Sequence, residues 1–427
     1  MMTIKPIAAS ERNLNGIDYF LLWAGVAISL AEIWAGGFLA PMGFWAGFWA
    51  IILGHVIGNT FMALGGVIGS QHGIISMVSV RPAFGIRGSN LPAIFNIIQL
   101  IGWASIMLII GGRAGAMLGK PFGGMLASSQ FWIILIGMGT LLWALGTGKS
   151  LWKILQTTAV IALLLVIVLM SWVSFGEFGS GVFAPHTDPM PFMIGLDLVI
   201  AMPISWMPLV ADYSRFAKKS GPAFWNTWWG YFLVSSWMYL LGLMATLVTG
   251  ETDPGALILQ TMGKIGFAVP ALIMVVFSTI TSDFPDIYSA TCSVMNISQK
   301  IKANTVMWMA GLLSIVVALV FPMDQYENFL LFIGAMFMPL FGVVLTDYFL
   351  LRKGKLEIDA IDTVGGPYWY FKGVNIIAAV AWAAGFVTFE IIALMQYPIG
   401  GSIPSMLVAG LIYYFMTRSK GDSRSMP

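Results

Sequence analysis

The chain has 427 residues, of which 58% are apolar and only 9% are charged, whereas about 25% are charged in a typical soluble domain. A soluble protein cannot bury that much apolar surface, and a net charge of +2 without a long basic run excludes a nucleic-acid-binding chain. The single cysteine and three scattered histidines exclude a disulfide framework and a Cys- or His-rich metal site.

A helix needs about 20 apolar residues to cross the hydrocarbon core of a membrane. The sequence contains twelve such stretches and predicts an all-α integral membrane protein with twelve transmembrane helices, surrounded by membrane lipid. In chain order, the predicted spans are 19–40, 44–68, 91–112, 130–147, 153–175, 190–213, 223–249, 266–296, 305–322, 327–351, 373–395 and 402–417.

Lys and Arg residues predict the orientation of these spans, because cytoplasmic loops carry an excess of both. With twelve spans, 18 of the 21 Lys and Arg residues fall on the side of the N-terminus. The sequence therefore predicts a protein of the plasma (inner) membrane with a cytoplasmic N-terminal segment, 1–18, and a cytoplasmic tail, 418–427.

Spans 1 and 6 each contain helix breakers near their centres. Span 1 contains Gly36 and Gly37, and span 6 contains Pro203 and Pro208, which lack a backbone donor. Paired interruptions in the first and sixth spans are typical of inverted-repeat transporters, which bind their substrate near the membrane midplane. The alternative is that Gly and Pro, which are common in membrane helices, merely kink these two spans.

Span 3 carries Gln99 and Trp103 four residues apart, and hence on one face of a helix. A flat ring and a carboxamide on one face can stack on a planar heterocycle and hydrogen-bond it. The alternative is that Trp103 packs between helices or lies at the membrane interface, as most aromatic residues of membrane helices do.

Span 8 is unusually rich in hydroxyl groups. Ser278, Thr281 and Ser282 follow the spacing of one helix face, and Pro285 leaves the carbonyl of Thr281 without a backbone donor. Hydroxyl and carbonyl oxygens are suited to a small hard cation, so this face predicts a site for a monovalent ion. The alternative is that these hydroxyls bond to the preceding helical turn or to a neighbouring helix.

Five carboxylates fall inside the predicted spans, where an ionised group is costly and marks a functional candidate. We rank Glu32, before the expected break of span 1, and Asp283, next to the hydroxyls of span 8, as the main candidates. For Asp197 and Glu390, a helix contact or a side chain reaching the interface is the expected role. The fifth carboxylate is Asp286.

The sequence contains no arrangement of His, Cys or acidic residues at catalytic spacing, so we expect a transporter and not an enzyme. Two other classes stay open at this point. A passive, channel-like facilitator would not accumulate its substrate, and the broken helices argue against it. A membrane-embedded enzyme would need the catalytic cluster that is missing here.

Several motifs give the chain a resemblance to a known family over roughly residues 19–417. They are ISLAEIWAGG in span 1, RPAFGIRGSNLPAIF and IQLIGW around span 3, LVADYSRFAKKSG at the end of span 6, TSDFPDIYSA in span 8, and LTDYFLLRKG at the end of span 10. The chain resembles the nucleobase–cation symport-1 (NCS1) family, within it the cytosine permeases, and most closely the hydroxymethylpyrimidine transporters.

The resemblance implies a LeuT-type fold with two inverted repeats of five helices, followed by two C-terminal helices. The repeats would be 19–175 and 190–351, and 352–417 would hold a linker and the last two spans. It also implies sodium-coupled uptake of a heterocycle by alternating access, in which spans 1, 2, 6 and 7 rock against spans 3, 4, 8 and 9. Na⁺ would be the coupling ion, and no organic cofactor and no obligate protein partner are expected.

The resemblance also implies where the ion binds. The family's sodium site falls on the span 1 backbone at Gly25 and Ile28 and on the span 8 hydroxyls of Thr281 and Ser282, with Ser278 close by. This set coincides with the hydroxyl face already described for span 8.

For the substrate, the resemblance implies stacking on Trp103 and contacts with the span 6 segment. Where the cytosine permeases have Phe, this chain has Pro203, so we expect Trp206 to replace that ring. Glu32 and Asp283 add acid where those permeases have a small polar residue and Asn, which would suit an amino-pyrimidine rich in donors. The full expected set is Ser29, Glu32, Gln99, Trp103, Ser205, Trp206 and Asp283.

We therefore expect uptake of a hydroxymethylpyrimidine, a thiamine precursor, with Na⁺. Two alternatives within transport stay open. The substrate could be cytosine, another nucleobase or a hydantoin, and the coupling ion could be a proton bound through Glu32 or Asp283.

Overall fold

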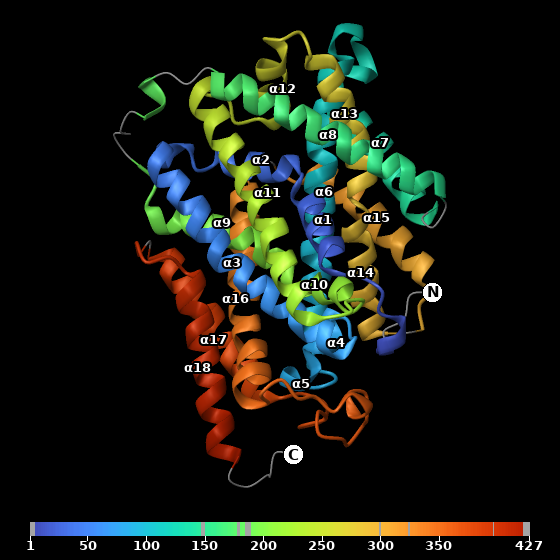
Figure 1. Cartoon of the computed structure of the whole chain (residues 1–427), viewed down its shortest axis with the longest axis vertical. Coiled ribbons are helices and arrows are strands. Elements are labelled where there is room, and N and C mark those ends of the chain that lie inside the picture. Colours follow the sequence, from blue (N-terminus) through green and yellow to red (C-terminus); the bar gives the residue numbers. More distant parts are fainter. Residues whose placement is uncertain are drawn as a thin grey trace.

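The computed structural model describes residues 5–146, 150–176, 180–183, 189–298, 300–322, 325–395 and 397–421, and helices make up most of them. Figure 1 shows these helices as one elongated bundle, with the C-terminal helices α17 and α18 along one side. A helix pairs its backbone polar groups within its own segment, as lipid requires. These helices are also apolar over most of their length.

Within the described residues, nine of the predicted spans are long and apolar enough to cross a membrane, if the bent pair Gly16–Ala27 (α1) and Leu30–Gly37 (α2) counts as one. The other eight are Phe44–His72 (α3), Asn90–Gly119 (α6), Phe192–Ser205 with Met207–Ser214 (α9 and α10), Ser220–Thr249 (α11), Ala268–Ser282 with Phe284–Ile297 (α13 and α14), Ala303–Val320 (α15), Tyr326–Leu345 (α16, extended by the π-helix η7, Thr346–Leu351) and Ile376–Leu394 (α17).

Three further helices lie where the remaining spans are predicted. They are Ser129–Gly146 (α7), Ser150–Gly176 (α8) and Ser402–Gly421 (α18). The order of helices therefore follows the predicted order, while the count of twelve membrane crossings stays a prediction.

Span 1 is broken at Ile28 and Ser29, where α1 and α2 meet at an angle of 58°. Ile28 leaves the helical region with a ψ of 82°, and the Ser29 hydroxyl begins α2 by accepting a hydrogen bond from the amide of Ala31. The prediction that Gly36 and Gly37 form the break is wrong, since both lie in the last turn of α2.

The two glycines serve helix packing instead. A Cβ atom on Gly36 would lie 2.1 Å from the carbonyl oxygen of Tyr239 on α11, and one on Gly37 would lie 2.8 Å from Oγ1 of Thr246. Only a residue without a side chain permits such a close approach of two helices.

Spans 6 and 8 are interrupted at the predicted prolines, although each still forms one continuous span. Trp206 separates α9 from α10, with Pro203 before it in α9 and Pro208 in the first turn of α10. Asp283 separates α13 from α14, and Pro285 lies in the first turn of α14. Pro208 and Pro285 are favourable at these positions because the amide hydrogen that proline lacks is not needed in the first turn of a helix.

The helices pack in two groups (Figure 1). In one group, α11 packs against α1, α2 and α3, and α3 packs against α9 and α10. In the other, α6 packs against α7, α13, α14 and α15. These groups correspond to spans 1, 2, 6 and 7 and to spans 3, 4, 8 and 9, the two sets that the resemblance predicts to move against each other.

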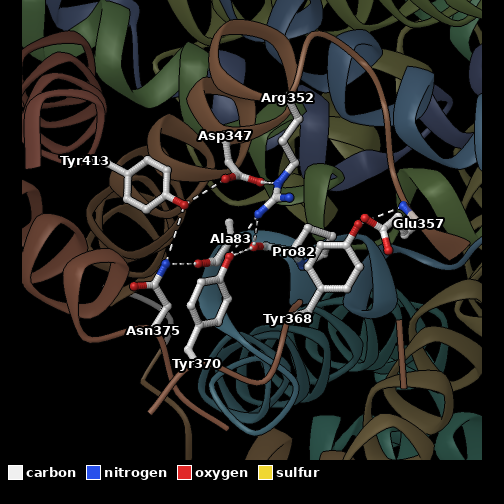
Figure 2. Close-up of polar contacts among 9 residues, drawn as sticks. All are labelled: Pro82, Ala83, Asp347, Arg352, Glu357, Tyr368, Tyr370, Asn375 and Tyr413. Carbon is white, nitrogen blue, oxygen red and sulfur yellow. Dashed lines mark hydrogen bonds and ion pairs between the residues drawn. The ribbon is translucent and has the colours of Figure 1, made fainter. Parts of the chain in front are cut away.

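A polar cluster joins η7 and the segment after it to the short helix Arg81–Phe84 (α5) (Figure 2). Asp347 forms an ion pair with Arg352, with 2.6 Å between Oδ2 and Nε, and accepts a hydrogen bond from the hydroxyl of Tyr413. Arg352 and the hydroxyl of Tyr370 both donate to the carbonyl of Pro82. Burial and the nearby Asp347 carboxylate raise the pKa of Tyr370, which therefore keeps its proton for this bond.

Arg81 makes a second connection at the same end of the molecule. Its guanidinium is buried, donates twice to Oδ1 of Asn296 on α14, at 3.2 and 2.8 Å, and forms an ion pair with Asp362. Burial lowers the pKa of Arg81 to about 10, so the group is still charged at neutral pH. Together these contacts hold span 8, α5 and the segment between spans 10 and 11 to one another.

Candidate functional site

Gln99 joins span 3 to the interruption of span 6. Its Nε2 atom donates to the carbonyl of Ser205, the last residue of α9, at 2.9 Å, and to Oδ1 of Asn96 at 2.8 Å. Its other atom, Oε1, is buried and has no hydrogen-bond partner among the described residues. Gln99 is therefore held in place through its amide nitrogen, while its amide oxygen is an unsatisfied acceptor.

Trp103 lies one helical turn after Gln99 on α6. The indole is 8% exposed, and the rings of Tyr326 and Phe329 meet it edge to face, with centroids 5.9 and 5.4 Å away. Its Nε1 atom is a donor and is also buried without a partner within the described part of the chain. Two aromatic neighbours thus fix the ring, while its polar atom stays unsatisfied.

The span 6 interruption places Trp206 on the side of spans 1 and 7. The ring meets Trp23 of α1 edge to face at 5.7 Å, and Nε1 donates to the hydroxyl of Tyr231 on α11 at 2.9 Å. The hydroxyl of Ser205 donates to the carbonyl of Met202 in its own helix, so its proton is not available to a substrate. Ser205 contributes its backbone carbonyl to the site through Gln99.

Asp283 contributes a third unsatisfied atom. The residue is 1% exposed and shares a hydrogen bond with Asp286, and its Oδ1 atom has no hydrogen-bond partner among the described residues. It lies between α13 and α14, both of which pack against α6, the helix of Gln99 and Trp103. Two acceptors and one donor, all buried, therefore lie on helices that touch one another.

Span 1 contributes Ser29 and Glu32 in different ways. The hydroxyl of Ser29 begins α2 and lies 3.7 Å from the sulfur of Met107 on α6, so it faces span 3. Both oxygens of Glu32 are engaged by α11, Oε1 by the hydroxyl of Tyr231 at 2.6 Å and Oε2 by Ser235. In this conformation Glu32 therefore binds span 7, although it was expected to bind the substrate.

The expected ion site is described only in part. The Gly25 carbonyl accepts a hydrogen bond from the amide of Ile28 at 3.3 Å, at the point where span 1 leaves the helical path. The hydroxyl of Ser278 donates to the carbonyl of Val275 in the preceding turn. The side chains of Thr281 and Ser282 lie outside the described residues, so their role as ion ligands stays a prediction.

Asp197 has the helix-contact role expected for it. Its carboxylate accepts hydrogen bonds from the amides of Gly401, at 2.6 Å, and Ser402, at 3.2 Å, where α18 begins. A carboxylate is favourable there because helix N-termini carry unpaired amides and a partial positive charge. Glu390 is exposed on α17.

Sequence reasoning missed His55, Asn96, Tyr231 and Ser235. His55 on α3 has Nδ1 2.8 Å from the carbonyl of Ile51 and Nε2 2.6 Å from Oγ of Ser235. Asn96 donates to Ser293 of α14 at 2.8 Å and so links span 3 to span 8. The four-residue spacing of Tyr231 and Ser235 places both on one face of span 7, and this could be predicted from the sequence. Their shared partner, Glu32 of span 1, could not.

Comparison with known proteins places this geometry in context. Residues 6–415 match the family described as permease for cytosine/purines, uracil, thiamine, allantoin. A Bacillus subtilis (strain 168) protein named as the purine-cytosine permease YxlA is 26% identical over 395 residues, which cover 83% of this chain and 81% of that protein. The cytosine permease of Escherichia coli (strain K12) is 25% identical over 323 residues, 74% of this chain and 73% of its own.

The fold has a solved counterpart in Mhp1, a nucleobase-cation-symport-1 family transporter, in a closed conformation with bromovinylhydantoin bound. The TM-score is 0.84 at 18% identity, and the match covers 99% of this chain and 96% of that one. This likeness confirms the predicted fold class.

Proposed function

We propose that this chain, which belongs to the family of permeases for cytosine/purines, uracil, thiamine, allantoin, imports an amino-pyrimidine together with Na⁺. The proposed amino-pyrimidine is of the hydroxymethylpyrimidine type. As a member of that family the chain is a multi-pass membrane transporter for small heterocycles and not an enzyme. Uptake would proceed by alternating access across the plasma (inner) membrane, with both termini in the cytoplasm.

The observation that carries the proposal is the set of unsatisfied atoms on Gln99, Trp103 and Asp283. A buried polar atom without a partner costs about 1–3 kcal/mol, so a ligand that pairs all three gains that energy. A hydroxymethylpyrimidine carries an amino group and a hydroxyl as donors and ring nitrogens as acceptors. These groups match the two acceptors, Gln99 Oε1 and Asp283 Oδ1, and the one donor, Trp103 Nε1.

Coupling to Na⁺ is supported by the position of the span 1 break. Ile28 and Ser29 interrupt the helix, so backbone carbonyls near Gly25 have lost regular helical partners. In the proposed cycle, Na⁺ binds between these carbonyls and the hydroxyls of span 8, and the heterocycle then stacks on Trp103. A nucleobase such as cytosine, or a hydantoin, is the second candidate substrate, because relatives are named for cytosine and a solved counterpart binds a hydantoin.

Thermal unfolding of the purified protein tests the proposal directly. The ligands are hydroxymethylpyrimidine, cytosine, uracil, purines and hydantoins, each with NaCl and with choline chloride at the same ionic strength. A ligand at 100 times its Kd should add about 2.7 kcal/mol to the free energy of unfolding. Stabilisation by hydroxymethylpyrimidine that requires Na⁺ is the expected result.

The other outcomes are equally informative. Stabilisation by cytosine alone would retain the family's activity and overturn the role given to the acidic residue Asp283. Stabilisation that is the same in choline chloride would overturn the coupling to Na⁺.

A further inference from the structure

Glu32, Ser235 and His55 form a buried chain of polar contacts, which we call the Glu32 triad. The three side chains lie on α2, α11 and α3 and are 2%, 0% and 0% exposed. Oγ of Ser235 contacts Oε2 of Glu32 on one side and lies 2.6 Å from Nε2 of His55 on the other. The serine lies between the acid and the histidine, so this is not the order of a hydrolase triad.

The hydrogen positions are fixed at both ends of this series of polar contacts, at Nδ1 of His55 and at Oε1 of Glu32. Nδ1 of His55 lies 2.8 Å from the carbonyl of Ile51, which only accepts, so Nδ1 carries a hydrogen. Nε1 of Trp206 only donates, so the hydroxyl of Tyr231 accepts from it and gives its own proton to Oε1 of Glu32. A proton bound to Glu32 therefore lies on Oε2, the atom that faces Ser235.

The hydroxyl of Ser235 has one proton for two neighbours. If it donates to Glu32, Nε2 of His55 must carry a hydrogen and the imidazole is positively charged. If it donates to His55, Oε2 of Glu32 must carry a hydrogen and the acid is neutral. In both cases the triad holds one proton more than an ionised Glu32 with a neutral His55 would hold. Without this extra proton, either the contact between Ser235 and Glu32 or the contact between Ser235 and His55 would lack a hydrogen.

The surroundings favour the neutral form. The titratable groups that face Glu32 are Tyr231 and Tyr239 on α11, Tyr326 on α16, and His55 beyond Ser235 on α3. None of these except His55 can supply a positive charge. Burying an ion pair costs more than burying a neutral acid hydrogen-bonded to a neutral base, unless further groups pair with the charges.

We propose that the Glu32 triad is a proton-binding site, which in this conformation holds its proton on Oε2 of Glu32. The site goes beyond the proposed uptake of a heterocycle with Na⁺, because its ligand is a proton. Through Tyr231 the triad is bonded to Trp206, so it connects the broken span 1 to the interruption of span 6. Loss of the proton removes one of these bonds and leaves a buried charge, so protonation favours the conformation described here.

Glu32→Gln is the test variant, because the amide reproduces the protonated acid and cannot titrate. Its carbonyl accepts from Tyr231, and its NH₂ donates to Ser235, which then donates to His55. Glu390→Gln, the same change at an exposed position of α17, is the matched control.

The first measurement is thermal stability as a function of pH, without substrate and without Na⁺. The folded protein holds the proton more tightly than the unfolded chain does, so raising the pH favours unfolding of the wild type. The unfolding equilibrium constant should rise by up to about tenfold per pH unit in the wild type and Glu390→Gln, and this linked change should be missing in Glu32→Gln. A Glu32→Gln protein that keeps the wild-type pH dependence overturns the proposal.

The second measurement is the infrared C=O band of a protonated carboxylic acid at neutral pH. The difference spectrum between the wild type and Glu32→Gln should contain this band. If the band is absent from the difference spectrum, the proton is not on Glu32 and the proposal is overturned. If Glu32→Gln does not fold, Ser235→Ala removes the acceptor of the Glu32 proton and should shift the band, whereas an unshifted band contradicts the site. Neither measurement uses transport, so failure of the proposed uptake would leave both results interpretable.

Discussion

Gly242 of α11 lies against the carbonyl of Ile33 in α2 so closely that a Cβ atom on the glycine would be 1.8 Å from the oxygen. Ile33 follows Glu32, whose side chain bonds to Tyr231 and Ser235 on the same helix α11. The close approach of the two backbones therefore brings the carboxylate of span 1 within reach of span 7.

Replacing Gly242 by Ala should separate α2 from α11. An extra methyl group in a tight interface typically costs about 1–3 kcal/mol, and here the obstacle is a backbone atom that cannot rotate away. We expect a lower unfolding temperature and reduced uptake. Gly221→Ala is the control on the same helix, because a Cβ there meets no atom within 4 Å, and it should leave stability unchanged or slightly higher. Equal stability of the two variants would contradict the close contact.

Replacing Trp103 by Ala should weaken substrate binding. Stacking of one base on an aromatic ring is worth about 1–3 kcal/mol, which corresponds to roughly a tenfold to hundredfold weaker affinity. Trp103→Phe keeps a ring and should lose less. The control is Trp172→Ala on α8, where the indole is 69% exposed. Ligand-induced thermal shifts measure all three, and an unchanged affinity of Trp103→Ala would remove this residue from the binding site.

The local chemistry of proline explains why the interruptions of spans 6 and 8 could be predicted from sequence. Pro208 and Pro285 each lie in the first turn of the following helix, a position that follows from the residue type alone. Glycine carries no such information, since it can permit either a break or a close contact. Which of the two applies to Gly36 depends on Tyr239 of α11, a residue more than two hundred positions away.

The candidate site also contains some contacts that follow from local sequence and others that depend on the packing of distant helices. Gln99 and Trp103 lie on one helix at a spacing that already places them on one face, so their pairing could be predicted. The partners of Glu32 come from spans 2 and 7, and only the packed structure shows that Ser235 connects it to His55. The sequence therefore identified Glu32 as a buried acid of functional interest, but it did not predict the contacts with Tyr231 and Ser235. A contact between Glu32 and the substrate stays a prediction.

Replacing Asp347 by Asn should destabilise the cluster shown in Figure 2. The change removes the charge that pairs with Arg352, whose guanidinium is largely buried beside the carbonyl of Pro82. Breaking a buried ion pair costs about 3–5 kcal/mol, and we expect about 2–3 kcal/mol because Arg352 keeps its other acceptors and some solvent contact. Asp359→Asn, at an exposed position of the same segment, is the control. A Tm equal to that of the control would show that the pair adds nothing to stability.

Replacing Thr281 and Ser282 together by Ala should abolish uptake driven by Na⁺ while leaving the protein in the membrane. The inward movement of one Na⁺ gains roughly 2.3 kcal/mol per 100 mV of membrane potential, so loss of the ion removes this driving force. Thr291→Ala is the matched control in the same span, because its hydroxyl is buried and donates only to the carbonyl of Ile287 in the preceding turn.

The measurement for this double variant is uptake into proteoliposomes with an inward Na⁺ gradient, together with Na⁺-dependent thermal stabilisation. The control should retain both signals, and the double variant should lose both, because each hydroxyl oxygen replaces part of the hydration shell of the ion. Undiminished uptake by the double variant would place the ion elsewhere. Loss of Na⁺ dependence with retained, pH-dependent uptake would indicate that protons, and not Na⁺, drive uptake.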